Sequence, residues 1–253
     1  MGKVIAVLNQ KGGVGKTTST INVAAALAKQ GMHILVIDLD PQANATSGLA
    51  VDKTSLKHTI YNVLLGEAKA VDSIVQTQTK GVDLLPADTV LAVAEQELVS
   101  VTGREQVLKT ALNGLDYDVI IIDCPPSLGL LSINALVAAE SVLIPVQTEF
   151  YALEGLGLLM QTIDKVQAGL NSELKLLGVV MTMYDKRNAL SGQVVDEVKK
   201  HFGEYTFNTL IPRNVRLAEA PSFGKTIFDH DKWSKGAKAY KSLAKEIATR
   251  VQG

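Results

Sequence analysis

The sequence predicts an α/β fold, in which helices cover both faces of a doubly wound, mostly parallel β-sheet. Two patterns indicate this fold. Seven short apolar runs lack the polar alternation of half-exposed strands, which is typical of parallel strands buried on both faces. Helical patterns lie between most of these runs. The chain has 253 residues, of which 47% are hydrophobic and 20% charged. This length and balance fit a single domain over residues 1–253.

The expected elements follow one another in alternation along the chain. The apolar runs predict strands at residues 4–8, 34–37, 82–85, 119–122, 142–146, 176–180 and 207–211. The helical spacing of apolar residues predicts helices at residues 17–29, 91–99, 104–112, 130–139, 154–170, 192–202 and about 237–251. Residues 41–70 are the least regular stretch, and we expect surface loop and short helix there.

Composition and charge exclude several classes of protein. The single cysteine, Cys124, rules out an internal disulfide and a thiolate metal site, and we interpret it as a buried structural thiol. No signal peptide and no apolar run of about 18 residues is evident, so we expect a cytoplasmic protein. The net charge is −1, but from Asp185 onward there are 13 basic and 8 acidic residues. This basic third indicates either a polyanion-binding surface or a solvated face of Lys-rich helices.

A glycine-rich loop lies between the first expected strand and the first expected helix. It reads Lys11-Gly12-Gly13-Val14-Gly15-Lys16-Thr17-Thr18. Glycines there leave room for phosphate oxygens, and successive N–H groups with the helix N-terminus attract an anion. Lys16 is then expected at the β- and γ-phosphates of ATP, and the Thr17 hydroxyl at Mg²⁺. The other interpretation, a glycine-rich turn without a ligand, does not explain the strand, loop, Lys-Thr and helix in this order.

Acidic residues end two of the expected strands, and parallel strands deliver their C-terminal ends to the ligand crevice. Asp38 and Asp40 end the second strand and would face the same way if the strand stayed regular. They indicate a role in holding metal or water, or else a solvated strand end. Asp123 follows four hydrophobic residues, a pattern that predicts contact with Mg²⁺ directly or through water.

The loop resembles the deviant Walker A box of the ParA/MinD superfamily. A strict P-loop would carry Gly where this chain has Gln10, and Lys11 stands at the front instead. The resemblance implies that Lys11 reaches across a homodimer interface to the partner's nucleotide. It also implies that Asp40 orients the attacking water, and that Asp38 lies in a second shell around the metal.

Further motifs resemble the short chromosomal ParA proteins, the Soj group. They are residues 40–49, 123–131, 150–156 and 211–222. This resemblance implies an ATPase that is slow until stimulated by a ParB/Spo0J-type centromere-binding partner, and an ATP-bound dimer that binds nucleoid DNA without sequence preference. It implies adenine contacts from Pro212 and Asn214, and DNA contacts from Arg187 and Arg216, with Lys199, Lys200 and Lys225 as helpers. For each lysine, a solvated charge remains an equal alternative.

The alternative function is that of a MinD-type membrane-associated regulator of cell division. Such proteins end in an amphipathic helix that enters the membrane interface. Here six residues recur at helical spacing near the C-terminus: Ala237, Tyr240, Leu243, Ala244, Ile247 and Val251. That face is small and lacks the Phe, Leu and Trp edge that drives interfacial insertion. We therefore expect the last helix to pack on the sheet and expect no membrane partner.

Overall fold

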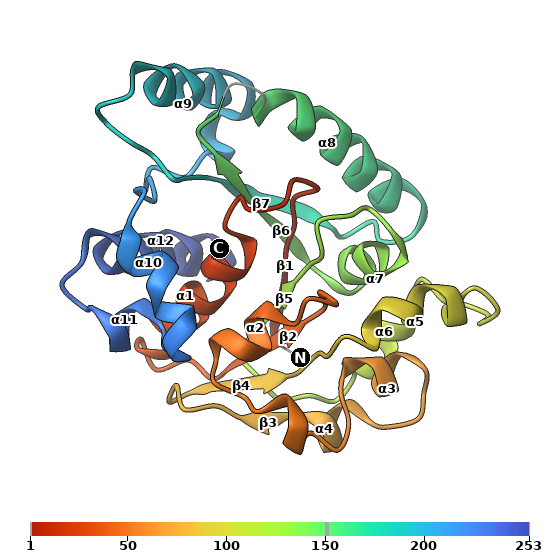
Figure 1. Cartoon of the computed structure of the whole chain (residues 1–253). Helices are drawn as coiled ribbons and strands as arrows, with labels where there is room; N and C mark the ends of the chain where they lie inside the picture. The colour runs from red at the N-terminus through yellow and green to blue at the C-terminus, as the bar shows by residue number, and fades with distance from the viewer. Residues whose placement is uncertain (1, 150–151, 253) are drawn as a thin grey trace.

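The computed structural model describes residues 2–149 and 152–252 (Figure 1). Within these residues, seven strands form one sheet in the order β3-β4-β2-β5-β1-β6-β7. Every neighbouring pair is parallel except β3 and β4. The strands are β1 Lys3–Val7, β2 Ile34–Asp38, β3 Val75–Gln76, β4 Val82–Leu85, β5 Val119–Asp123, β6 Ser141–Gln147 and β7 Lys175–Thr182. The predicted doubly wound, mostly parallel sheet is confirmed.

Helices connect the strands. The α-helices are α1 Lys16–Ala28, α2 Asn44–Gly48, α3 Ile60–Leu64, α4 Ala70–Ser73, α5 Leu91–Leu98, α6 Val107–Ala111, α7 Leu130–Ala138, α8 Ala152–Gly169, α9 Ala189–Phe202, α10 Val215–Glu219, α11 Ile227–His230 and α12 Lys235–Gln252. Three short 3-10 helices are η1 Lys53–Ser55, η2 Gly203–Tyr205 and η3 Ala220–Phe223. The irregular stretch at residues 41–70 consists of short helices and loop, as expected.

Two hydrophobic layers lie on opposite faces of the sheet. Alternate residues of β1 separate between them: Val4 and Ala6 belong to one cluster, Ile5 and Val7 to the other. Because side chains alternate along a strand, a run that is apolar at every position feeds both layers. Helices α1 and α12 cover the second face, and they lie side by side in Figure 1.

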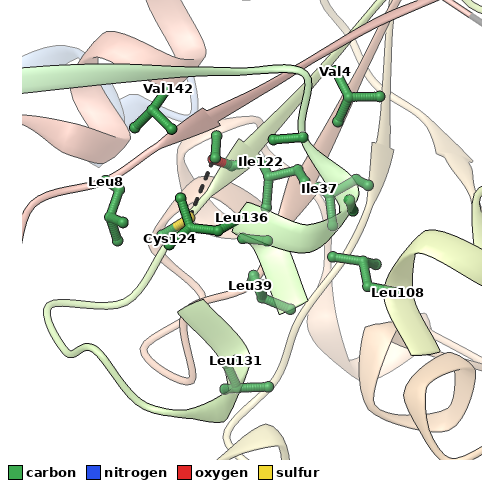
Figure 2. Packing of buried hydrophobic residues seen from close by; sticks show 14 of the residues in the cluster. Val4, Leu8, Ile37, Leu39, Leu108, Ile122, Cys124, Leu131, Leu136 and Val142 are labelled. Carbon is green, nitrogen blue, oxygen red and sulfur yellow. Dashed lines mark hydrogen bonds between the residues drawn. The ribbon is translucent and has the colours of Figure 1, made fainter. Parts of the chain in front are cut away.

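Cys124 lies in the first layer, surrounded by aliphatic side chains (Figure 2). It is fully buried, and its Sγ–H donates to the Ile122 carbonyl at 3.7 Å. Burial raises the pKa of this thiol. A thiol that stays protonated in an apolar setting is a poor nucleophile, so the structure agrees with a structural role for Cys124.

The seventh predicted strand, residues 207–211, is wrong. The segment runs beside β7, and the N–H groups of Phe207 and Ile211 donate to the carbonyls of Val179 and Met181 at 2.9 and 2.8 Å. These contacts give only isolated bridges, Val179 with Thr206 and Tyr184 with Pro212. Between them, the N–H groups of Asn208 and Thr209 donate to the Glu246 carboxylate at 2.9 and 3.0 Å. A side chain of α12 thus interrupts the ladder in the middle of the segment. The sheet described above reaches seven strands because it includes β3, a two-residue antiparallel edge strand that the sequence did not predict.

Candidate nucleotide-binding site

The residues predicted for the phosphate and metal site converge at the C-terminal edge of the sheet. Strands β1, β5 and β2 are direct neighbours, so the loop after β1 lies beside the residues that end the other two strands. Asp123 of β5 pairs in register with Val7 of β1 on one side and with Asp38 of β2 on the other. In a doubly wound sheet, this edge is where ligands bind.

The glycine loop is shaped for close approach of a ligand. Gly13 and Gly15 have φ values of 74° and 90°, in the left-handed region that favours glycine. Gly15 is the N-cap of α1, so the first N–H groups of that helix face the loop. A Cβ built on Gly12 or Gly13 would meet no atom within 4 Å. The two glycines therefore face open space beside a helix N-terminus, where a phosphate can approach the backbone N–H groups.

Side chains from distant elements hold the loop in place. The Asn9 Oδ1 accepts from the Lys11 N–H at 3.0 Å, and its Nδ2 donates to the Pro145 carbonyl of β6 at 2.8 Å. The Thr182 hydroxyl, at the end of β7, donates to the Val14 carbonyl at 2.8 Å. Thus β6 and β7 both fix the loop.

The two lysines of the loop point to different surroundings. Lys16 is 7% exposed, and its Nζ donates to the Lys11 carbonyl at 3.4 Å. Burial lowers the pKa of Lys16, and the charges of Asp123 and Asp40 oppose this effect. The Lys11 side chain is 45% exposed and forms an ion pair with Glu149 at 2.8 Å. Only Lys16 is thus buried among the acidic residues of its own site.

Two fully buried carboxylates end β5 and β2 beside the loop. Asp123 accepts from the Thr17 hydroxyl at 2.6 Å and from the Thr20 hydroxyl at 3.2 Å. Asp38 accepts from both the N–H and the hydroxyl of Thr46 at 2.7 Å. Burial raises the pKa of both carboxyl groups, and the charge of Asp38 adds to the effect on Asp123. A bound cation would stabilise the ionised forms.

Asp40 lies outside the regular strand. β2 ends at Asp38, so Asp40 is not part of the strand. The expectation that the Asp38 and Asp40 side chains face the same way required a regular strand through both residues, so it does not apply. The Asp40 N–H donates to Asp38 Oδ1 at 3.3 Å, while Asp40 Oδ1 accepts from the Gln42 N–H at 2.9 Å. Asp40 is 7% exposed and near enough to act electrostatically on Lys16. It therefore belongs to the same site.

The oxygen donors fit Mg²⁺. Among the described residues, no group of three or more His, Cys, Asp or Glu side chains could hold a metal by itself. Mg²⁺ is usually bound through one or two carboxylates together with phosphate oxygens and water. The hydrogen-bonded pair of Thr17 and Asp123 supplies a hydroxyl and a carboxylate at the loop, which is what a nucleotide-bound Mg²⁺ takes from a protein.

The segment around Pro212 and the glycine loop both contact the end of β7 or the residues just after it. Pro212 bridges Tyr184, two residues after the Thr182 that contacts Val14. The Asn214 Oδ1 accepts from the Arg216 N–H at 2.8 Å and caps α10. No contact of this structure tests the adenine role of Pro212 and Asn214, so that role stays a prediction.

The predicted basic residues do not form one cluster. Arg187 pairs with Asp185 at 2.8 Å before α9, and Arg216 pairs with Glu219 at 2.9 Å on α10. Lys199 and Lys200 lie in the last turn of α9, about 15 Å along the helix from its first residue, Ala189, which follows Arg187 by two positions. Lys225 is exposed after η3. The structure leaves their DNA contacts a prediction.

Sequence reasoning missed Thr20, Thr46, Thr182 and Glu149 as members of this site. Thr20 had a signal, because it lies three residues after Thr17 and therefore on the same helix face. The contacts of the other three are set by distant parts of the chain. The Phe150 and Tyr151 of the motif at residues 150–156 lie outside the described residues.

This loop, its buried lysine and the paired carboxylates at the C-terminal edge of a parallel sheet define a P-loop nucleotide-binding protein. Comparisons with known proteins agree. Residues 2–176 match a family model described as an AAA domain. The chain is 53% identical over 250 residues to the sporulation initiation inhibitor protein Soj of Bacillus subtilis, covering 98% of this chain and 99% of that protein.

A further relative and a solved structure are also similar to this chain. The chromosome partitioning protein ParA of Caulobacter vibrioides is 48% identical over 252 residues, covering 98% of this chain and 94% of that protein. A solved structure of cobyrinic acid a,c-diamide synthase from Mycobacterium smegmatis, with bound ADP and magnesium, is 40% identical. It superposes with a TM-score of 0.87 and covers 100% of this chain and 96% of that one. The chain belongs to the ParA/Soj family of chromosome-partitioning P-loop ATPases, within the ParA/MinD superfamily, and uses ATP and Mg²⁺.

Proposed function

We propose that this chain is a nucleotide-controlled switch for chromosome partition. ATP joins two copies face to face, and the dimer binds nucleoid DNA without sequence preference. A ParB/Spo0J-type centromere-binding protein stimulates an otherwise slow hydrolysis to ADP and phosphate, which releases the dimer. ATP thus selects the DNA-binding state, and hydrolysis resets it. The protein works in the cytoplasm on the nucleoid.

The single observation that carries this proposal is the different placement of the two loop lysines. Lys16 is 7% exposed, within its own site, whereas the side chain of Lys11 is 45% exposed at the front of the loop. A second positive charge that faces outward next to a nucleotide site is available to a nucleotide held by another copy. Lys11 is therefore assigned to the partner's phosphates.

The other site residues divide the chemistry among them. Phosphoryl transfer depends mainly on positioning and on neutralising charge. Lys16 and the N–H groups from Gly12 to Thr18 hold the phosphates, and Asp40 orients the attacking water. Thr17 and Asp123 would hold Mg²⁺, which would supply positive charge to neutralise the phosphates, and Asp38, beside Asp123, would support them without touching the metal. Pro212 and Asn214 hold the adenine.

DNA binding is assigned to basic side chains on the exposed surface. Arg187 and Arg216 are the main contacts, and Lys199, Lys200 and Lys225 add to them. All five are exposed. Contacts of this kind go to phosphates, so affinity falls steeply with salt and carries little sequence information.

A MinD-type membrane regulator remains the second candidate, and the last helix speaks against it. Tyr240, Leu243, Ala244 and Ile247 of α12 are at most 1% exposed, because they pack in the same layer as α1. The apolar face of α12 is therefore not free to enter a lipid interface. No described helix is long and apolar enough to cross a membrane.

Parallel co-sedimentation separates the two candidates. The protein is mixed with plasmid DNA or with anionic phospholipid vesicles, each with ATP and with ADP. The proposal expects ATP-dependent retention on plasmid that disappears at high salt, and none on vesicles. ATP-dependent retention on vesicles without plasmid binding would instead establish the membrane regulator.

A further inference from the structure

The ion pair between Lys11 and Glu149 keeps the front lysine within its own chain. The Lys11 Nζ and the Glu149 Oε2 are 2.8 Å apart, and their side chains are 45% and 47% exposed. Neither residue is buried, so the contact is open to solvent and can be exchanged. Lys11 is also the residue that, in the proposed function, contacts the phosphates of the nucleotide in the other subunit.

Strand β6 holds both members of this pair. On one side, the Asn9 that binds the Lys11 N–H is itself fixed to the Pro145 carbonyl of β6. On the other side, Gln147 ends β6, its Nε2 donates to Glu149 Oε1, and its carbonyl accepts from the Glu149 N–H at 2.8 Å. Gln147 therefore holds both the backbone and the carboxylate of Glu149 beside the loop, so that Lys11 contacts a carboxylate that is already in position.

We propose that Glu149 is a positioning residue that retains Lys11 in the separate subunit and must release it when the ATP dimer forms. This inference rests on the proposed role of Lys11. A lysine whose ammonium lies on a carboxylate of its own chain has to leave it in order to reach phosphates in a second chain. The phosphate oxygens then replace the carboxylate as the anionic partner. Glu149 thus opposes dimer closure and favours the separate subunit until ATP is present.

The expected size follows from the exposure of the pair. Exposed ion pairs change an equilibrium constant by about 1.4- to fivefold. Two such pairs open for each dimer, so their factors multiply, and removing both should favour dimerisation by about two- to 25-fold. Salt screens exposed charges, so this difference should shrink as ionic strength rises.

The test compares Glu149→Gln with the wild-type chain and with a matched control, Glu140→Gln. Glu140 forms an ion pair of the same kind with Lys3, at 2.9 Å with side chains 44% and 54% exposed, but at the opposite end of β6. Sedimentation velocity over a protein dilution series with ATP and Mg²⁺ gives the dimer dissociation constant. The midpoint of thermal unfolding without nucleotide verifies that both variants fold.

We expect Glu149→Gln to lower the dimer dissociation constant about two- to 25-fold at low salt, with Glu140→Gln unchanged. A Glu149→Gln variant that dimerises as the wild type does, or more weakly, overturns the inference. Lys11→Ala, measured alongside, separates this failure from that of the proposed function. If Lys11→Ala still dimerises normally with ATP, the assignment of Lys11 to the partner's nucleotide is wrong, and the inference about Glu149 is overturned with it.

Discussion

Asp38 and Asp123 lie directly beside each other, at matched positions of the neighbouring parallel strands β2 and β5, and neither has any exposed surface. Two carboxylates so placed disfavour each other's ionised form. Burial is the larger cause of the raised pKa of both groups, and the Asp38 charge comes second for Asp123. The hydroxyl of Thr17 and the charge of Lys16 act in the opposite direction on the pKa of Asp123.

This pair makes the nucleotide-free protein sensitive to pH. Because the folded pKa values of Asp38 and Asp123 are raised, the folded chain binds more protons than the unfolded chain between the ordinary and the raised values. Their contribution to stability is fully present below the ordinary pKa of an aspartate and is lost as the pH rises through the raised values. Asp123→Asn should therefore stabilise the nucleotide-free protein by about 1–3 kcal/mol at pH 8 and not at pH 4.

Urea unfolding followed by circular dichroism at the two pH values measures this difference. Asp116→Asn, which changes an exposed carboxylate, is the control and should alter stability little at either pH. An equal gain from Asp123→Asn at pH 4 and pH 8 would show that the effect does not come from ionisation.

Lys16→Ala should remove most of the affinity for ATP. Lys16 is the buried cation of the loop and lies among the charges of Asp123 and Asp40. Loss of a charged hydrogen-bond partner should weaken binding about ten- to 100-fold or more. Isothermal titration with ATP and Mg²⁺ measures the affinity, and Lys29→Ala, at the far end of α1, should bind as the wild type does. Normal affinity in Lys16→Ala would refute the site.

Asp40→Ala should separate ATP binding from hydrolysis. Its proposed task is to orient the attacking water, so the variant should still bind ATP and should accumulate as a dimer. Loss of a general base or positioning group typically costs about 100-fold or more in rate. Phosphate release and sedimentation velocity together test this, with the exposed Asp72→Ala on α4 as the control. Rapid turnover by Asp40→Ala would exclude the assigned role.

Arg216→Glu should lose DNA while it still dimerises with ATP. The Arg216 guanidinium is exposed and lies between two carboxylates, with Glu219 at 2.9 Å and Asp231 at 3.8 Å. Reversing its charge places three negative groups together and should weaken plasmid binding at least about tenfold at low salt. Lys109→Glu makes the same charge change on α6, which packs in the other hydrophobic layer, and should retain DNA. Unchanged binding by Arg216→Glu would place the DNA surface elsewhere.

The parts of the site that the sequence predicted are local in the chain. The loop from Lys11 to Thr18, the strand before it and the helix after it form one continuous segment, so composition and spacing suffice. Asp38 and Asp123 were found because each follows an apolar run. By contrast, the contact of Thr46 with Asp38 depends on how the irregular stretch folds back, and no periodicity reports that.

The wrong strand at residues 207–211 has a similar cause. Its composition suits a strand, but whether backbone N–H groups find a neighbouring strand depends on what else is near. Here Phe207 and Ile211 bond to β7, but the Glu246 carboxylate, 37 residues beyond Thr209, accepts from the N–H groups between them, so no continuous ladder forms. β3 was missed because it has only two residues, which are too few to show the pattern of a strand.

The order of the strands also sets when the site comes into being during synthesis. β5 lies between β1 and β2, so the loop and Asp38 gain their shared neighbour, Asp123, only after 85 residues beyond Asp38 have been made. At 5–20 residues per second, this is a delay of about 4 to 17 seconds. A nascent chain that ends before β5 carries the whole glycine loop and still lacks the carboxylate assigned to the metal. Thr182, which holds the loop, and the Pro212 and Asn214 assigned to adenine are made later still. ATP binding with Mg²⁺ is therefore a property that the chain acquires late in synthesis, after β7 has joined the sheet.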